Sequence, residues 1–476
     1  MLWGWDFFAT FVEPNYYSMI KSVTISLVFS ALASFASAQT TLWRTDTARH
    51  EFYRIPAVIA YGDNIIALTD NRSGVTDATV WGDVGSVGNI SIEARYSSDR
   101  GRTWTAPRRI VEGFGSGTFD QSHGDAAVVR DRLTGRLLMM CASGTTGYGR
   151  SKATPADGYA TALQVGRYYS LDDGRTWNGR NVTPQMYGIY DSNSEQPVER
   201  LFFASGRICQ SRMVRKGFYY RLYAALTTNC GTLVVYSDDF GGQWHALGGS
   251  NARPAPKGDE SKIEELPDGS VVLSCRMMGG RTFNVFTYNG KDFDEGTWAQ
   301  PTESTDPITG TAALDNATNG ELLIVSARRA SNVVGGKNIV DGKDVVGGTE
   351  VVDGTSSIPV KGERVWLALQ SVPRGTEGNH PSNRERRSHV SIYWKAFSSC
   401  DAMRSPEAWT TGWKRHEVTS GYSAYSTMDV DGNGDIAFLY EDNGVRLKLG
   451  SQYTEVYDVV FRSLTLQEIT GGEYLP

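Results

Sequence analysis

Ser97-Ser98-Asp99-Arg100-Gly101-Arg102-Thr103-Trp104 has the form Ser-x-Asp-x-Gly-x-Thr-Trp, and this pattern recurs along the chain. Residues 170–177 repeat it in full, and residues 237–244 depart from it only at Gln243. The closing tryptophans of these copies lie 73 (177 − 104) and 67 (244 − 177) positions apart, and weaker copies end at Trp298 and Trp409. This spacing predicts one copy per supersecondary unit of a repeat architecture.

The residue types of the pattern are those of a tight turn between two strands. An Asp side chain accepts hydrogen bonds from backbone N–H groups, Gly adopts a positive φ without strain, and Trp packs the turn against the sheet. We therefore interpret the copies as structural turns that lie away from any substrate.

Short apolar runs follow turn residues six times along the chain. They span residues 62–68, 135–140, 221–226, 269–274, 320–326 and 434–440. Apolar runs of this length, bounded by turn residues, are typical of strands buried on both faces, and the stacked sheets of a propeller bury their strands in this way. The sequence predicts an all-β fold, a six-bladed β-propeller of four-stranded antiparallel sheets. A β-sandwich enzyme with a lectin-like partner is the alternative.

Composition agrees with a folded, strand-rich chain. Of 476 residues, 40% are apolar, 52 are glycine, 12 are Trp and 23 are Tyr. The net charge is 47 − 53 = −6 and no basic block occurs, which argues against a nucleic-acid partner.

The cysteines and histidines carry no metal-binding pattern. There are five cysteines, an odd number, with no Cys-x-x-Cys, and no His-Glu-x-x-His motif occurs. These features favour neither a zinc ribbon nor a disulfide scaffold. A Cys209–Cys230 pair is the one disulfide that we considered.

The N-terminus has the features of a secretory signal. Residues 19–38 contain Lys21, a short apolar stretch and an Ala-x-Ala end at Ala36-Ser37-Ala38. We interpret residues 1–38 as a signal peptide with Met19 as the true start, and residues 39–476 as the propeller. The expected location is periplasmic, cell-surface or secreted, with no membrane span in the mature chain. An anchored helix is the alternative.

One segment interrupts the blade pattern. Residues 331–354 repeat with a six-residue period rich in Val and Gly, which occurs nowhere else in the chain. We interpret about 331–360 as an insertion in a loop between blades five and six. Short hairpins are expected there, with a hexapeptide-like coil or disorder as alternatives.

Phe52-Tyr53-Arg54-Ile55-Pro56 opens the first blade and adds a second motif to the repeated turns. The two motifs together resemble the sialidases, glycoside hydrolase family 33, over essentially the whole mature chain, and the turns match the Asp boxes of that family. The resemblance implies an exo-α-sialidase with no metal or organic cofactor.

Sialic acid carries a carboxylate on its anomeric carbon, and arginine guanidinium groups match carboxylates bidentately. The family holds this group with three arginines. By resemblance these are Arg54, Arg276 at the end of the strand after Glu-Leu-Pro-Asp-Gly, and Arg387 before a later strand. Arg386 and Arg384 are adjacent alternatives to Arg387.

The same carboxylate would repel a negatively charged nucleophile, and sialidases use a tyrosine. The segment around Tyr425 resembles the family's nucleophile segment, and Tyr422 is the alternative. The tyrosine needs a base, for which Glu260 stands 276 − 260 = 16 residues before Arg276. Glu264 and Glu265 are interpreted as strand residues.

Further positions follow from the resemblance. Glu441 is expected to orient Arg54, and Arg72 and Asp125 are expected to contact substrate. The acid/base is Asp77, five residues after Arg72, or alternatively Asp83.

The resulting hypothesis is an exported enzyme that removes terminal α-linked sialic acids from glycoproteins, glycolipids and oligosaccharides with retention of configuration. A trans-sialidase, a hydrolase of neutral glycans and a non-catalytic sialic-acid-binding propeller are alternatives. The sequence leaves linkage preference and oligomeric state open.

Overall fold

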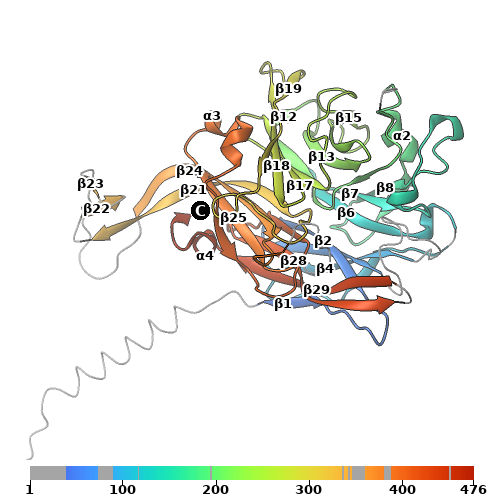
Figure 1. The fold of residues 1–476 in the computed structure, drawn as a ribbon, viewed down its shortest axis with the longest axis horizontal. Helices are drawn as coiled ribbons and strands as arrows, with labels where there is room; N and C mark the ends of the chain where they lie inside the picture. Colours follow the sequence, from blue (N-terminus) through green and yellow to red (C-terminus); the bar gives the residue numbers. More distant parts are fainter. Residues whose placement is uncertain are drawn as a thin grey trace, which may run out of the picture. The chain divides into compact units, whose positions relative to one another are not determined.

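A computed structural model describes residues 39–72, 89–115, 117–192, 196–334, 337–340, 343–345, 360–379, 387–449 and 452–476. Residues 40–476 form one compact unit, which consists mainly of β-strands (Figure 1). The all-β prediction is confirmed. The predicted signal peptide lies outside the described residues.

The largest sheet combines strands from both ends of the chain. It contains β27 (Ser426–Val430), β28 (Ile436–Leu449), β29 (Gln452–Leu464), β2 (Tyr53–Tyr61), β3 (Asn64–Asn71), β4 (Ser91–Ser97) and β5 (Arg108–Val111), with β1 (Thr40–Trp43) on β29. Its two halves, β27–β29 and β2–β5, meet at one residue pair, Tyr53 with Tyr457.

Two five-stranded sheets follow along the chain. The first contains β6 (His123–Arg130), β7 (Leu137–Ser143), β8 (Gln164–Ser170), β9 (Asn178–Asn181) and β11 (Gly206–Arg207), which is parallel to β6. The second contains β10 (Leu201–Phe203), β12 (Cys209–Arg215), β13 (Tyr220–Thr228), β14 (Gly231–Ser237) and β15 (His245–Ala246).

Two further sheets complete the set. One contains β16 (Ser261–Glu265), β17 (Val271–Met277), β18 (Gly280–Tyr288), β19 (Gly296–Trp298) and β20 (Thr302–Ser304). The other contains β21 (Glu321–Val334), β22 (Lys337–Val340), β23 (Lys343–Val345), β24 (Val360–Pro373), β25 (Val390–Phe397), β26 (Lys414–Glu417) and β30 (Tyr474–Leu475).

The described strands thus form five hydrogen-bonded sheets, and the count of six blades remains a prediction. The six apolar runs all form strands, as predicted. Five of them, in β3, β7, β13, β17 and β28, have a hydrogen-bonded neighbour strand on each side, whereas residues 321–326 of β21 pair with β24.

Within the residues that the structure describes, the helices are short and connect strands. They are α2 (Thr183–Gly188), α3 (Cys400–Met403), α4 (Leu466–Thr470) and the 3-10 turns Phe119–Gln121, Tyr148–Arg150, Pro155–Asp157 and Pro406–Trp409. Within the described ranges, none of the helices has the length and apolar character that a membrane span requires.

The repeated turn forms as the sequence predicts. Thr103 donates from its N–H and hydroxyl to the two oxygens of Asp99 at 2.9 and 2.6 Å. The N–H of Gly101 donates to Ser97 Oγ at 2.8 Å, and Gly101 has a φ of 83°. The second copy has the same set of bonds. Each turn connects the third and fourth strands of a blade, so it braces the outer edge of its sheet.

The Val- and Gly-rich segment extends one sheet. β21 pairs with β24 over most of the length of both strands, and β22 and β23 continue from β21 as antiparallel hairpins. Figure 1 shows these strands at one end of the molecule. The insertion therefore joins two strands of one sheet, and its predicted place between two blades is wrong. The hairpins agree with the prediction where the structure describes this segment.

The suggested Cys209–Cys230 disulfide is also wrong, because all five cysteines are free thiols. Cys209 pairs with Tyr223 across the β12–β13 ladder, whereas Cys230 lies in the turn after β13. β13 runs five residues (228 − 223) beyond Tyr223, at about 3.3 Å each, before the turn that carries Cys230, which puts the two thiols beyond the reach of a disulfide.

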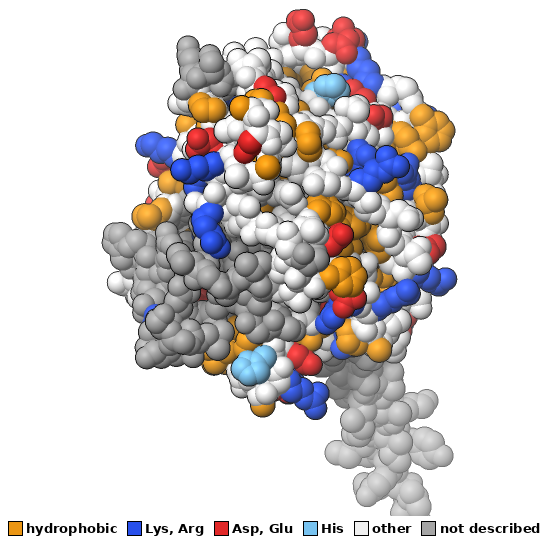
Figure 2. Space-filling model, turned by 90° about the vertical axis from the view of Figure 1, so that its right-hand side faces the viewer, with side chains coloured by type: hydrophobic (Ala, Val, Ile, Leu, Met, Phe, Trp, Pro, Cys, Tyr) orange, Lys and Arg blue, Asp and Glu red, His pale blue; other side chains and the backbone are white. Residues whose placement is uncertain are grey.

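The hydrophobic core lies between neighbouring sheets, for example where Ile66 and Ala94 meet Leu137 and Met139. The innermost strands contact one another in turn: β6 with β2, β2 with β27, β27 with β21, and β21 with β16. We call the end where these strands begin the leading end, and the opposite end the trailing end. On the face in Figure 2, basic and acidic side chains are interspersed.

Candidate active site

Tyr425 lies at the leading end, immediately before β27, and it is buried. Its hydroxyl donates to Glu260 Oε2 at 2.7 Å, and Glu260 immediately precedes β16. Arg276 Nη1 donates to the tyrosine hydroxyl at 3.2 Å and to Glu260 Oε2 at 2.5 Å. A tyrosine, a carboxylate and a guanidinium therefore meet here. They lie at the start of β27, at the start of β16 and near the end of β17.

Two more guanidinium groups flank the tyrosine ring. Arg54 Cζ lies 5.5 Å and Arg387 Cζ lies 5.3 Å from the centre of the Tyr425 ring. Arg387 Nε is buried and has no hydrogen-bond partner among the described residues. A buried donor of this kind favours an anionic ligand, since an unpaired buried polar group is costly.

The environment raises the pKa of Tyr425 above its ordinary value of 10.0. Burial is the largest cause and the negative charge of Glu260 is the next, while Arg276 and the two flanking arginines oppose them. The hydroxyl is therefore neutral at rest and has a base in hydrogen-bond contact.

Glu441 ties several of these groups in place from β28. It is fully buried, and its Oε1 accepts from Arg54 Nε at 2.7 Å and from the Ile55 N–H at 2.8 Å. Its Oε2 accepts from the Tyr425 N–H at 3.0 Å. One carboxylate thus orients an arginine and the backbone beside the tyrosine.

The backbone at Ile55 is strained. Its φ is 57°, which is rare for a β-branched residue, and the β2–β3 register shifts between Arg54 and Ala57. Bulges and left-handed residues of this kind occur next to functional sites, where they aim a side chain. Here the bulge accompanies the turn of Arg54 toward Glu441.

A second charged cluster lies on β3 and β6. Arg72 Nη2 lies 3.0 Å from Asp70 Oδ2 and 3.7 Å from Asp125 Oδ1. The N–H of Asp125 donates to Asp70 Oδ1 at 3.1 Å, and Asp125 itself has a φ of 55°. A Cβ on Gly124 would lie only 2.8 Å from Asp70 Oδ2, so the close approach requires glycine.

Both acids of this cluster are buried, and burial raises the pKa of each. For Asp125 the negative charge of Asp70 adds to the effect, and Glu260 acts in the same direction more weakly. Asp125 Oδ2 has no hydrogen-bond partner among the described residues, so it is available to a ligand hydroxyl or amide.

The structure brings together Arg54, Arg276, Arg387, Tyr425, Glu260 and Glu441, and it places Arg72 and Asp125 in the neighbouring cluster. Both acid/base candidates, Asp77 and Asp83, lie outside the described residues, as do Arg384 and Arg386. Their assignments remain predictions.

Three alternatives have other surroundings. The side chain of Tyr422 is exposed, at 48%. Glu264 and Glu265 end β16 at the trailing end, where they bond Arg207, Arg212 and Ser211. Their interpretation as strand residues is confirmed.

Sequence reasoning missed several residues that contact the predicted ones. Asp259 Oδ2 lies 3.5 Å from Arg276 Nε, and Asn316 Oδ1 accepts from Arg276 at 3.4 Å. The ring of Tyr457 lies 5.1 Å from Arg54 Cζ. Asp70 had a detectable signal, since it lies two positions before Arg72 in a strand and so on the same face. Among the described residues, no group of His, Cys, Asp and Glu side chains forms a metal site.

The BNR repeat-like domain family matches residues 85–436, about three quarters of the chain. The chain therefore belongs to the BNR repeat-like domain family. Its Asp-box turns and its set of antiparallel sheets are consistent with that assignment.

The comparisons confirm the resemblance to sialidases. A sialidase of Micromonospora viridifaciens is 29% identical over 251 residues, which are 51% of this chain and 36% of that protein. The chain thus matches only about a third of the length of this curated relative.

Solved structures of sialidases share the fold. The NanB sialidase from Streptococcus pneumoniae matches 93% of this chain and 73% of that one, with a TM-score of 0.58 and 14% identity. The intramolecular trans-sialidase from Ruminococcus gnavus matches 92% of this chain and 99% of that one, with a TM-score of 0.57 and 15% identity.

Proposed function

We propose that the protein is an exported exo-α-sialidase, a retaining glycoside hydrolase that releases terminal α-linked sialic acids from glycoconjugates. The observation that carries the proposal is the Tyr425 hydroxyl, which lies between Glu260 and Arg276 and is flanked by Arg54 and Arg387. The kinship with sialidases supports it.

The arginines account for the substrate class. A sialic acid brings its carboxylate to the carbon that reacts, so the site must hold an anion beside the nucleophile. Arg54, Arg276 and Arg387 stay charged at all working pH values and offer forked donors. A hydrolase of neutral glycans has no use for three such groups around one tyrosine.

The tyrosine accounts for the nucleophile. A carboxylate would be repelled by the bound anion, whereas a neutral phenol is not. Because burial keeps Tyr425 protonated, attack on the anomeric carbon requires proton transfer as the bond forms, and Glu260 at 2.7 Å accepts the proton.

The reaction also needs a group that protonates the leaving oxygen while the tyrosine attacks and then activates water in the second half. Asp77 is our first assignment and Asp83 the second. Attack by tyrosine and then by water inverts the anomeric carbon twice, so the configuration is retained.

Arg72 and Asp125 are proposed to hold other substituents of the sugar. Asp125 offers a buried oxygen without a partner in the described structure, and Asp70 positions both residues. A trans-sialidase would use the same residues, so acceptor preference decides between the two activities.

The test is incubation with 3′- and 6′-sialyllactose, with and without excess isotope-labelled acceptor lactose, and chromatography with mass spectrometry of the products. We expect free sialic acid as the main product in both conditions. Transfer to the added lactose as the main outcome would favour the trans-sialidase, and no conversion of any sialoside would contradict the proposal.

The acid/base assignment has its own test. Asp77→Ala should lose turnover of sialyllactose yet keep turnover of a substrate with an activated phenolic leaving group, since such a group barely needs an acid. Asp83→Ala is the matched variant, and the opposite pattern would transfer the role to Asp83.

Export is tested separately by N-terminal sequencing of protein recovered outside the cytoplasm. The expected start is near Gln39. A start well before that residue would contradict the signal-peptide assignment.

A further inference from the structure

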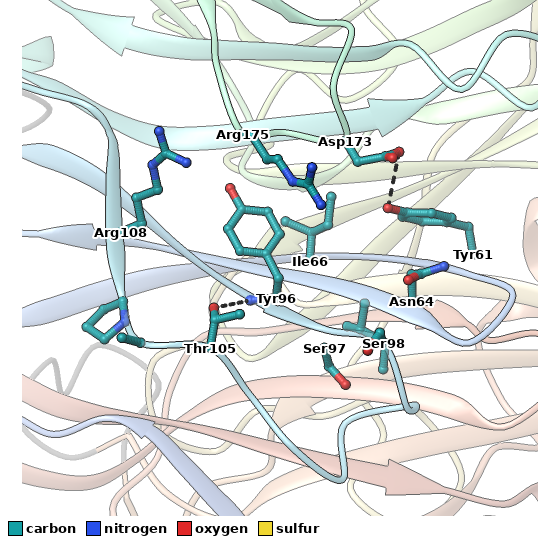
Figure 3. Close-up of a pocket in the computed structure, with 13 residues that line it drawn as sticks. Tyr61, Asn64, Ile66, Tyr96, Ser97, Ser98, Thr105, Arg108, Asp173 and Arg175 are labelled. Carbon is teal, nitrogen blue, oxygen red and sulfur yellow. Dashed lines mark hydrogen bonds between the residues drawn. The ribbon is translucent and has the colours of Figure 1, made fainter.

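A groove of about 590 Å³ lies between the first two Asp-box turns (Figure 3). It is lined by the end of β2, the end of β4 and the loop before β5, together with Asp173 and Arg175 of the second turn. None of the residues proposed for catalysis lines it.

The groove lies at the trailing end, far from Tyr425. Tyr61, which lines it, is the last residue of β2, whereas Arg54 is the second. Seven residues of strand at about 3.3 Å each place the two levels ~23 Å apart. A ligand here would occupy a site of its own.

Two tyrosines form fixed walls. Tyr96 donates from its hydroxyl to the Gly174 carbonyl at 2.6 Å, and Tyr61 donates to Asp173 Oδ1 at 3.3 Å. Both rings therefore bridge from the first sheet to the second turn. The guanidinium of Arg130 lies 4.0 Å over the Tyr61 ring and so covers one of its faces.

The charges of the groove are unequal. Two arginines, Arg108 and Arg175, and one acid, Asp173, line it. The acid already contacts Tyr61 and lies 3.8 Å from Arg130 Nε, which is outside the groove. No ion pair or hydrogen bond from the side chain of Arg108 or Arg175 is found in the described structure. Figure 3 shows Tyr96 between these two arginines.

We propose that this groove binds a pyranose ring that carries a carboxylate, as a second glycan site separate from the Tyr425 centre. The apolar face of a sugar ring packs on an aromatic ring, and Tyr96 with Ile66 supplies that surface. Guanidinium groups on either side match a carboxylate. Asn64 and Ser98 offer polar groups to the ring hydroxyls.

The carboxylate belongs to a sialic acid or a uronic acid, and the experiment separates these sources. Binding is measured by calorimetry and saturation-transfer NMR on the full-length Tyr425→Phe chain, so that no substrate is consumed. The probes are 3′-sialyllactose, a hyaluronan tetrasaccharide and neutral lactose.

Arg108→Gln with Arg175→Gln is the groove variant. Lys291→Gln with Arg364→Gln is its control, because both positions are exposed and the net charge changes equally. Lys291 lies in the turn between β18 and β19 and Arg364 on β24, so neither lines the groove. All four side chains are exposed, so the fold should be retained, and circular dichroism checks this.

We expect at least one acidic probe to lose tenfold or more of its affinity at one site in the groove variant and less than twofold in the control. Loss for sialyllactose alone assigns a sialic acid, loss for hyaluronan alone assigns a uronic acid, and loss for both assigns the shared carboxylate.

Equal affinity in both variants, an equal loss in both, or binding of lactose as strong as that of the acidic probes would overturn the proposal. The result does not depend on the proposed function. If that function fails, wild-type protein leaves sialyllactose intact, whereas the groove is judged by binding alone.

Discussion

Arginines gather at both ends of the inner strands, but their partners differ. At the trailing end, Arg207 and Arg212 bond Glu264, and Arg212 also lies 3.5 Å from Glu265. Asp429 there accepts from two backbone N–H groups. Arg207 and Asp429 line two cavities of about 220 and 470 Å³, and Arg212 and Glu264 line the larger one as well. These arginines and carboxylates pair with one another, although the buried Nε of Arg207 has no hydrogen-bond partner in the described structure.

At the leading end the arginines surround a group that can react. Arg276 contacts both Tyr425 and its base, whereas Arg387 has a buried nitrogen without a partner in the described structure. Glu441 holds Arg54 from behind. The difference teaches that a cluster of arginines does not by itself indicate a ligand site. The groups that the arginines contact show whether the cluster serves binding or stability. The leading end is built for a ligand and the trailing end for stability.

Replacing the proposed nucleophile at the leading end should cause the largest loss of activity. Tyr425→Phe keeps the ring and removes the hydroxyl, so kcat on 3′-sialyllactose should fall by ~10⁴-fold or more. Thermal unfolding should show a folded variant. Tyr422→Phe is the control, and a comparable loss of activity there would move the nucleophile to that residue.

Removing an ion pair at the trailing end should lower stability and leave activity unchanged. Glu264→Gln removes the negative charge that pairs with Arg207 and Arg212, so the free energy of unfolding should fall by about 3 kcal/mol. Urea unfolding measures this, while kcat/KM of the folded fraction should stay within twofold. A large kinetic defect at unchanged stability would contradict the comparison.

Conservative Arg→Lys substitutions should affect catalysis at the leading end but not at the trailing end. Arg387→Lys keeps the charge and loses the fork, so kcat/KM should fall ~10²-fold, or about 2.7 kcal/mol of transition-state binding. Arg212→Lys is the matched variant at the trailing end, where the kinetics should not change. Equal effects of the two substitutions would remove the distinction.

Asp125 gives the smallest effect, through pH. Its folded pKa is raised by burial and by Asp70, so the stability linked to its neutral form is present below its ordinary pKa of ~3.9 and is lost as pH rises through the raised value. Asp125→Asn stays neutral. At pH 8 the free energy of unfolding of this variant should exceed that of wild type by about 1 kcal/mol, which raises its unfolding temperature. At pH 4 the two proteins should be equally stable. A variant less stable at pH 8 than at pH 4, relative to wild type, would contradict this.

Much of the fold was predictable because its signals are local. The turn at 97–104 depends on bonds within eight residues, and the apolar runs need only their own neighbours. The insertion was misplaced since strand order depends on pairing with residues 360–373, which a local pattern does not encode.

The site was predictable only as far as the family resemblance reached. The contact of Arg276 with Tyr425 spans 149 residues, and the bulge at Ile55 depends on Glu441, 386 residues away. Spacing did not choose between Arg387 and its neighbours. The place of Asp70 two residues before Arg72 could have indicated their ion pair, but its bond from the Asp125 backbone could not be predicted, because only the folded sheets bring the two residues near.

The central claim is that Tyr425 at the leading end attacks a sialic acid and that water then displaces it. NMR of the first product formed from 3′-sialyllactose tests it most directly. The account predicts that the α-anomer of free sialic acid appears first and then mutarotates to the β-anomer. First appearance of the β-anomer, or release that persists unchanged in Tyr425→Phe, would contradict it.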